Sequence, residues 1–154
     1  MSPQEFEQYC FLRLYSVDLD TAAKAIPILR RYRRNDVRFA LLRDIAVIYS
    51  RPFSVNRGKL IKKHVLSLKH VPSSLRPLHD RLLKLRNTQF AHTDLDFNSP
   101  KVMRLGTEGR PIYAMSLKSV DYAQLLTHDS DISRLINAVA ASVNAAIEAH
   151  QTRL

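Results

Sequence analysis

Cysteine, glycine and tryptophan are scarce in this chain of 154 residues, which contains one, three and none of them. The single cysteine, Cys10, excludes both a disulfide and a cysteine-based zinc site within one chain. Gly106 and Gly109 do not form a phosphate-binding loop, because no Gly-Lys-Ser or Gly-Lys-Thr sequence follows them and no helix is expected to begin there. The scarcities therefore argue against a disulfide-stabilised fold and against a P-loop nucleotide site.

Long apolar runs are missing as well. No run approaches the ~20 residues that span a bilayer, and the first residues do not contain the apolar core of a signal peptide. We therefore expect a cytoplasmic protein without membrane contacts.

The histidines do not form a recognisable metal-ligand pattern. His64 and His70 are six positions apart and His79 lies nine further on, a spacing that matches no common site. A His-x-Asp-x-Asp string begins at His92, but no second ligand cluster accompanies it. We expect no metal and no cofactor, and we expect Asp94 to orient His92 or to pair with a basic side chain.

The overall composition is that of a folded domain. Hydrophobic residues make up 45% of the chain and charged residues 25%, which is ordinary for a soluble globular protein. A chain of this length buries roughly two-thirds of its extended surface. We predict a single domain over residues 1–154.

Positive charge is concentrated in one part of the sequence. The chain has 24 Lys and Arg against 14 Asp and Glu, a net charge of +10. Residues 24–86 hold 17 basic and three acidic residues, so the remainder is net acidic. Such a field attracts polyanions and predicts nucleic acid as a partner. The alternative is solubility charge on the outer faces of helices.

Two basic segments are candidate nucleic-acid contacts. In the densest, four guanidiniums could hold phosphates while Tyr32 stacks on a base; the alternative is a solvated helix end. Its residues are Arg30, Arg31, Tyr32, Arg33 and Arg34. The second segment lies in a long connection over residues 52–72 and contains Arg57, Lys59, Lys62 and Lys63.

Helical periodicity covers most of the chain. Ser2-Pro3-Gln4-Glu5 fits a capping box, and a second helical pattern runs from Thr21 to about Arg34. Pro27 lies inside that pattern and predicts a kink or a break just before it, so one bent helix and two separate helices both remain open. Further helices are expected over 37–49, from about Ser74, and over about 129–151.

Residues 101–117 have a strand-like pattern and not a helical one. Val102–Leu105 and Ile112–Met115 are strand-like runs around two glycines, which indicates a hairpin or an extended loop. Because two strands alone are marginally stable, we expect them to pack on the helices. The prediction is an all-α bundle of about five main helices with this one excursion.

The most informative stretch ends the helix expected from Ser74. On a helical wheel centred on Leu82, Arg86 falls about 40° to one side and His92 about 80° to the other, so both are directed toward the apolar face. Burying an unpaired guanidinium is costly, so Arg86 requires an anion, a carboxylate or a wet interface. The alternative is an arginine that reaches a nearby Asp, with His92 as a C-terminal cation. The apolar face consists of Leu75, Leu78, Leu82 and Leu85.

The sequence Arg86-Asn87-Thr88-Gln89-Phe90-Ala91-His92 resembles the signature of the HEPN superfamily, in which Arg and a polar residue precede a His. The flanking Leu82–Leu85 and the ending Phe-Ala-His-Thr-Asp are similar to its abortive-infection branch. The resemblance extends over residues 76–96.

The resemblance implies a metal-independent endoribonuclease from a defence, toxin–antitoxin or RNA-processing system. It implies a homodimer in which two motifs line one cleft, with RNA as substrate and an antitoxin as a candidate protein partner. Carried onto this chain, Arg86 and His92 form the catalytic pair and Asn87 supports them.

The chemistry is consistent with that implication. In one straight helix Arg86 and His92 lie ~9 Å apart along the axis and ~120° apart around it, so convergence requires the helix to loosen near Ala91 or a second protomer to supply the missing group. His92 would act as general acid or base at a 2′-hydroxyl, and Arg86 would bind the non-bridging oxygens, leaving a 2′,3′-cyclic phosphate. The alternatives are a non-catalytic module that binds nucleic acid or a partner protein, and a structural dimer in which Arg86 only satisfies an interface.

Overall fold

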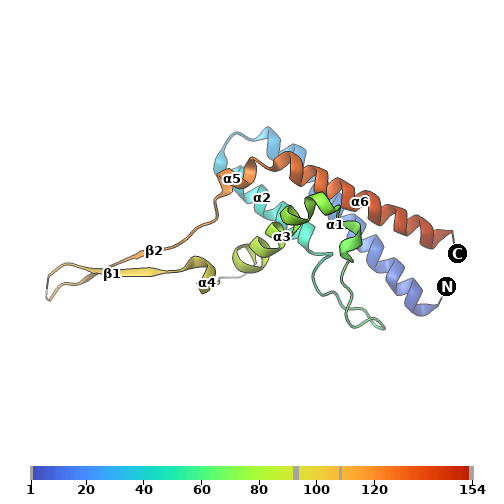
Figure 1. Cartoon of the computed structure of the whole chain (residues 1–154), viewed down its shortest axis with the longest axis horizontal. Helices are drawn as coiled ribbons and strands as arrows, with labels where there is room; N and C mark the ends of the chain where they lie inside the picture. The colour runs from blue at the N-terminus through green and yellow to red at the C-terminus, as the bar shows by residue number, and fades with distance from the viewer. Residues whose placement is uncertain (1, 92–93, 108, 153–154) are drawn as a thin grey trace.

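The computed structural model describes residues 2–91, 94–107 and 109–152. Four helices form the body of the molecule, and two short helices flank a β-hairpin (Figure 1). The four are α1 (Pro3–Arg31), α2 (Asn35–Ser50), α3 (Arg76–Leu85) and α6 (Asp129–Gln151). The short helices are α4 (Leu95–Asn98) and α5 (Tyr122–Leu126), and the strands are β1 (Lys101–Leu105) and β2 (Ile112–Ser116). The predicted all-α bundle with a small hairpin is confirmed.

Helix α1 is a single helix of 29 residues. It begins with the predicted capping box, in which the Ser2 hydroxyl accepts from the Glu5 N–H at 3.2 Å and the Glu5 carboxylate accepts from the Ser2 N–H at 2.6 Å. It continues through Pro27, so of the two alternatives left open by the sequence, one helix is observed and not two. Pro27 is exposed and removes one N–H, while Ile26 and Leu29 on either side are buried and hold the helix against the core.

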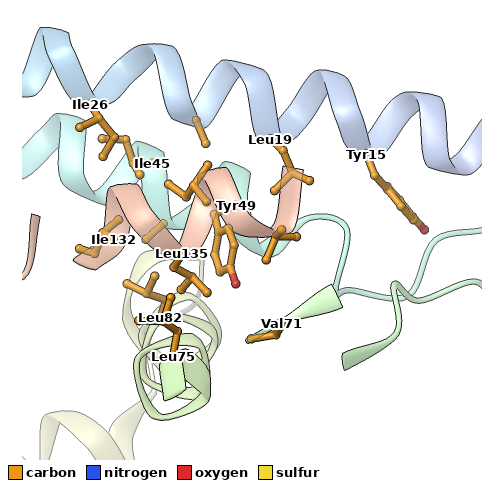
Figure 2. Packing of buried hydrophobic residues seen from close by; sticks show 14 of the residues in the cluster. Tyr15, Leu19, Ile26, Ile45, Tyr49, Val71, Leu75, Leu82, Ile132 and Leu135 are labelled. Carbon is orange, nitrogen blue, oxygen red and sulfur yellow. The ribbon is translucent and has the colours of Figure 1, made fainter. Parts of the chain in front are cut away.

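The core lies where the long helices meet. Helix α1 packs on α2 and α6, and α3 packs on the same two helices from another side. Figure 2 shows side chains from all four converging, among them Leu19, Tyr49, Leu82 and Leu135. Each of these four is fully buried, and burying a large apolar side chain stabilises a fold by about 1.5–3 kcal/mol.

The connection between α2 and α3 contains little regular structure. Its two 3₁₀ turns cover Leu68–His70 and Ser73–Leu75, and an isolated bridge pairs Asn56 with His64. His64 is held by the Tyr15 hydroxyl at 2.8 Å from its Nδ1 and stacks on Phe11. The connection is therefore fastened to α1 at specific points.

The hairpin departs from expectation in its packing. β1 and β2 pair antiparallel, with Met103 opposite Ala114 and Leu105 opposite Ile112. It projects from the bundle at the end opposite to the first turn of α1 and the last turn of α6 (Figure 1). Most of its residues are exposed, so the prediction that the strands pack on the helices is wrong for this chain.

None of the described helices combines the length and the apolar character that a bilayer crossing requires.

Candidate nucleic-acid site

The predicted motif begins at a change in helical geometry. Helix α3 ends at Leu85, and residues Arg86–Phe90 continue it as a π-helical turn, which we call the π segment. Its closing bond runs from the Ala91 N–H to the Arg86 carbonyl at 3.0 Å, one residue longer than in an α-helix. Isolated π turns are rare and often mark functional sites.

The π segment meets part of the geometric requirement for convergence. A widened turn changes the direction of the residues that follow Arg86, and it lies immediately before Ala91, where the sequence required the helix to loosen. His92 lies outside the described residues. The structure thus places Arg86 and Asn87 of the predicted catalytic set and leaves the position of His92 open.

Arg86 is half-buried and incompletely satisfied. Its Nη1 donates to the Asn87 Oδ1 at 2.8 Å, so the predicted supporting residue does contact it. Its Nε is buried and has no hydrogen-bond partner in the described part of the chain. No carboxylate among the described residues forms an ion pair with Arg86. A buried donor without an acceptor costs about 1–3 kcal/mol, a cost that an acceptor from a ligand or a second chain would remove.

Three aromatic rings fix the end of the π segment. Phe90 stacks on Tyr122 with ring centroids 5.9 Å apart, and Tyr122 stacks on Phe39 at 4.9 Å. These rings come from the π segment, α5 and α2, so the motif is attached to two other elements. Stacked pairs of this kind contribute about 0.5–1.5 kcal/mol beyond their buried area.

Arg38 is a second half-buried arginine, which the sequence analysis did not single out. It lies on α2 beside Phe39, it is half-buried, and its Nε is the second buried arginine nitrogen without a described partner. The signal was present, because the buried stripe Leu42, Ile45 and Tyr49 extends back by one four-residue step to Arg38. A second guanidinium therefore lies on a helix that packs against the π segment.

Asp94 has a structural role at the base of the hairpin. Its Oδ1 accepts from the Phe97 N–H at 3.0 Å and caps α4. It also lines a cleft of about 520 Å³ with Lys84 and Thr88 from the motif helix and Lys118 from the chain after β2. The cleft combines two lysines with two carboxylates, those of Asp94 and Asp96, so its formal charges balance. The predicted contact of Asp94 with His92 involves a residue that is not described.

The first basic cluster lies at the same end of the bundle as the π segment (Figure 1). Arg30 pairs with Asp129 at 2.8 Å and Arg34 pairs with Asp36, while Arg31, Tyr32 and Arg33 are exposed. These residues form the end of α1 and the turn to α2, at the end of the bundle where α5 also lies (Figure 1). Two guanidiniums and one aromatic ring are thus available at the same end of the bundle as the π segment.

The second basic segment lies at the other end. The Glu7 carboxylate accepts backbone N–H groups from Lys59, Leu60 and Ile61, which fastens the connection to the start of α1. The Ile61 N–H makes the largest contribution to holding the pKa of Glu7 below its ordinary value. The segment carries Arg57, Lys59, Lys62 and Lys63, all exposed.

The two basic segments do not form one surface. Glu7 and Arg31 are separated by most of α1, which at 1.5 Å per residue amounts to about 36 Å. The first cluster lies at the same end of the bundle as the π segment, and the second lies at the other end (Figure 1). The uniform basic surface suggested by residues 24–86 is therefore divided into two.

The histidines of the α2–α3 connection and of α3 form hydrogen bonds within the fold, as structural residues do. His79 is fully buried and its Nδ1 bonds the Tyr49 hydroxyl at 2.7 Å, while His70 Nδ1 bonds the Ser142 hydroxyl at 2.9 Å. Burial lowers the pKa of His64, His70 and His79. Across the described ranges, no three His, Cys, Asp or Glu side chains are grouped so that they could hold a metal ion.

Comparison with known proteins adds no relative: no family model matches the chain, and no curated protein or solved structure is significantly similar to it.

Proposed function

We propose that this chain is a HEPN-like, metal-independent endoribonuclease that acts as a homodimer in a defence or toxin–antitoxin type of RNA cleavage. The observation that carries the proposal is the state of Arg86, a half-buried guanidinium in a π-helical turn with one contact to Asn87 and a buried Nε that no described group satisfies. A scissile phosphate supplies the acceptors that this group needs.

The roles follow from the chemistry of the side chains. Arg86 binds the non-bridging oxygens and stabilises the charge that develops on phosphorus, while Asn87 holds the guanidinium in place. His92 transfers the proton at the 2′-hydroxyl or at the leaving oxygen, and a positioned group of this kind contributes typically ~10²–10⁴ in rate. The second protomer brings its own motif to the same cleft.

A second candidate is a non-catalytic module that binds RNA or a partner protein. The exposed Arg31, Tyr32 and Arg33 at the motif end of the bundle favour it, because cations beside an aromatic ring bind single strands without any chemistry. This module would bind RNA in a salt-sensitive manner, would not cut it, and would be unaffected by His92→Ala.

The test is incubation of purified protein with several RNAs in excess EDTA, followed by analysis of the product ends. The nuclease proposal predicts cleavage under these conditions and 2′,3′-cyclic phosphate ends. Arg43→Ala on the exposed side of α2 is the matched arginine control and should cut normally, whereas Arg86→Ala should not. Intact RNA with retained binding would favour the non-catalytic module instead.

A further inference from the structure

An apolar groove lies between the first half of α1 and the connection that follows α2. Its volume is about 600 Å³, within the range of about 300–1,000 Å³ that is typical of small-molecule sites. Among the residues that line it, Phe11 is 7% exposed, whereas Phe6 and Leu14 are 58% and 62% exposed. None of its lining residues belongs to the π segment, so the groove is separate from the proposed nuclease site.

Hydrogen bonds hold the two walls of the groove together. The Glu7 carboxylate on α1 accepts the backbone N–H groups of Lys59 at 2.6 Å and Ile61 at 2.5 Å. On the connection itself, the Gly58 N–H donates to the Ile61 carbonyl at 2.8 Å. The groove is therefore formed before any ligand binds, as most ligand sites are.

The length and volume of the groove limit what can occupy it. Its lining on α1 runs from Pro3 to Leu14, which at 1.5 Å per residue is ~16 Å. A volume of about 600 Å³ over this length corresponds to a mean cross-section of ~36 Å². An α-helix with its side chains is about 10–12 Å wide and has a cross-section of ~80–110 Å². A helix of a partner protein is thus too wide, whereas a single alkyl chain fits.

Two cations lie on one side of this apolar groove. Arg57 and Lys59 line it, are exposed and form no ion pair in the described part of the chain. Lys62 adds a positive charge nearby, since its Nζ donates to the Lys59 carbonyl at 2.6 Å. The Glu7 carboxylate also lines the groove, but its oxygens accept the backbone N–H groups of the connection. This side of the groove therefore attracts an anionic group.

We propose that the groove binds a free amphiphile of the fatty-acid class, with a single alkyl chain and an anionic head group. The alkyl chain packs on Phe6, Phe11 and Leu14, and the carboxylate lies between the side chains of Arg57 and Lys59. Transfer of the chain from water to this apolar surface drives binding, and the cations fix its direction. The inference does not rest on the proposed nuclease function.

Cys10 reports directly on occupancy, because it lines the groove and is the single cysteine of the chain. Dodecanoate at about ten times its Kd, below its micelle concentration, should slow the reaction of Cys10 with a thiol reagent about tenfold, since only the empty groove exposes the thiol. Dodecyltrimethylammonium, which has the same chain and a cationic head, should protect Cys10 little. Circular dichroism follows the helices in the same samples, and loss of helical signal at the protecting concentrations would count against the proposal.

Chain length tests the apolar part of the interaction. In titration calorimetry with octanoate, decanoate and dodecanoate, affinity should rise about fourfold for each added methylene, the factor expected when each one is buried. An affinity that does not depend on chain length would contradict the proposed placement of the alkyl chain.

Matched variants locate the site on the protein. Leu14→Gln should lower the affinity for dodecanoate about tenfold, whereas Val17→Gln, three residues further along α1 and 61% exposed, should not change it. Lys59→Gln should lower it about two- to fivefold, and Lys63→Gln, which removes an equal charge outside the groove, should have little effect. Absence of Cys10 protection by dodecanoate, equal protection by the cationic amphiphile, or equal losses in the groove variants and their controls would overturn the proposal.

Discussion

Arg86 occupies a position that a structural arginine rarely has. Its aliphatic stem continues the apolar face of α3, yet its Nε is buried without an acceptor in the described residues and no described carboxylate neutralises its charge. Both features lower the stability of the isolated chain. A group retained at such a cost is expected to act on something outside the monomer.

Replacing Arg86 with methionine tests whether the guanidinium serves the fold. Methionine keeps the apolar stem and removes the unsatisfied nitrogen, so we expect the Tm of Arg86→Met to equal or exceed that of the wild type, with a gain of up to about 1–3 kcal/mol in the free energy of unfolding. RNA cleavage should be lost. Thermal unfolding followed by circular dichroism measures the first effect, and a clear fall in Tm would show that Arg86 has a structural role.

His79 makes the fold sensitive to acid. It is fully buried, its Nε2 has no described partner, and burial lowers its pKa below the ordinary 6.5. The pKa values of His64 and His70 are lowered by the same cause. The unfolded chain therefore binds more protons than the folded chain in the range between the lowered values and 6.5.

The free energy of unfolding should accordingly be constant above about pH 7 and should fall as the pH decreases through 6.5 and below. Urea unfolding at about pH 7.5, 6.5 and 5.5 measures this, in a range where most carboxylates stay ionised. His79→Gln should reduce the slope, and His70→Gln, a less buried site, keeps the test available if that variant does not fold. Equal stability at all three pH values would contradict the assignment of neutral buried imidazoles.

At the scale of single elements, Glu7 organises the basic connection. Its carboxylate accepts three successive backbone N–H groups, and Gly58 lies so close that an added Cβ would come within 2.5 Å of the Glu7 carboxyl carbon. A side chain at position 58 would therefore displace the Glu7 carboxylate from its present position. Among the described side chains, only Glu7 accepts hydrogen bonds from the backbone of residues 59–61.

Trypsin measures the release of this connection. Glu7→Ala should accelerate cleavage after the four basic residues of the segment, which are Arg57, Lys59, Lys62 and Lys63. Cleavage within the helices should not change, because their packing does not involve Glu7. Glu148→Ala on the exposed side of α6 is the matched control. An unchanged digestion rate in Glu7→Ala would show that the carboxylate contributes little to holding the segment.

Local sequence signals predicted some elements well and others only partly. The capping box at Ser2 and the last helix, expected over about 129–151, depend on residues near in sequence, and both were predicted. The continuity of α1 through Pro27 depends on tertiary packing of Ile26 and Leu29, which no local rule contains. The π segment is likewise held by stacking of Phe90 on Tyr122, a contact across more than thirty residues.

The hairpin shows a second limit of prediction from the sequence. Strand-like runs around Gly106 and Gly109 indicated the turn, and both glycines adopt positive φ. The expectation that the strands pack on their own helices assumed that a single chain buries all of its apolar surface. The two strands instead stay exposed in the described part of the chain.

At the scale of the whole molecule, the charge is divided between the ends of the bundle. The sequence revealed the basic surplus of residues 24–86, but only the fold shows that Arg31 and Arg33 lie at the motif end and Lys62 and Lys63 at the other. The packing of α2 against the π segment is likewise a property of the fold and not of the local sequence.

Because the two basic segments lie at opposite ends of the bundle, we expect them to contribute unequally to RNA binding. Arg31→Ala with Arg33→Ala should lower affinity and reduce the slope of log affinity against log salt by about 1–2, since each lost phosphate contact on a single strand contributes ~0.7. Lys62→Ala with Lys63→Ala changes the net charge equally and should have the smaller effect. Fluorescence anisotropy with a labelled RNA measures both, and equal effects would indicate non-specific attraction by net charge.

The most direct test of the account compares wild-type protein with His92→Ala for RNA cleavage in excess EDTA, with Tm measured on the same samples. The account predicts that the wild type cuts RNA and that His92→Ala loses ~10²-fold or more of the rate at an unchanged Tm. Cleavage by His92→Ala at the wild-type rate, or intact RNA after incubation of the wild type with several substrates, would contradict it.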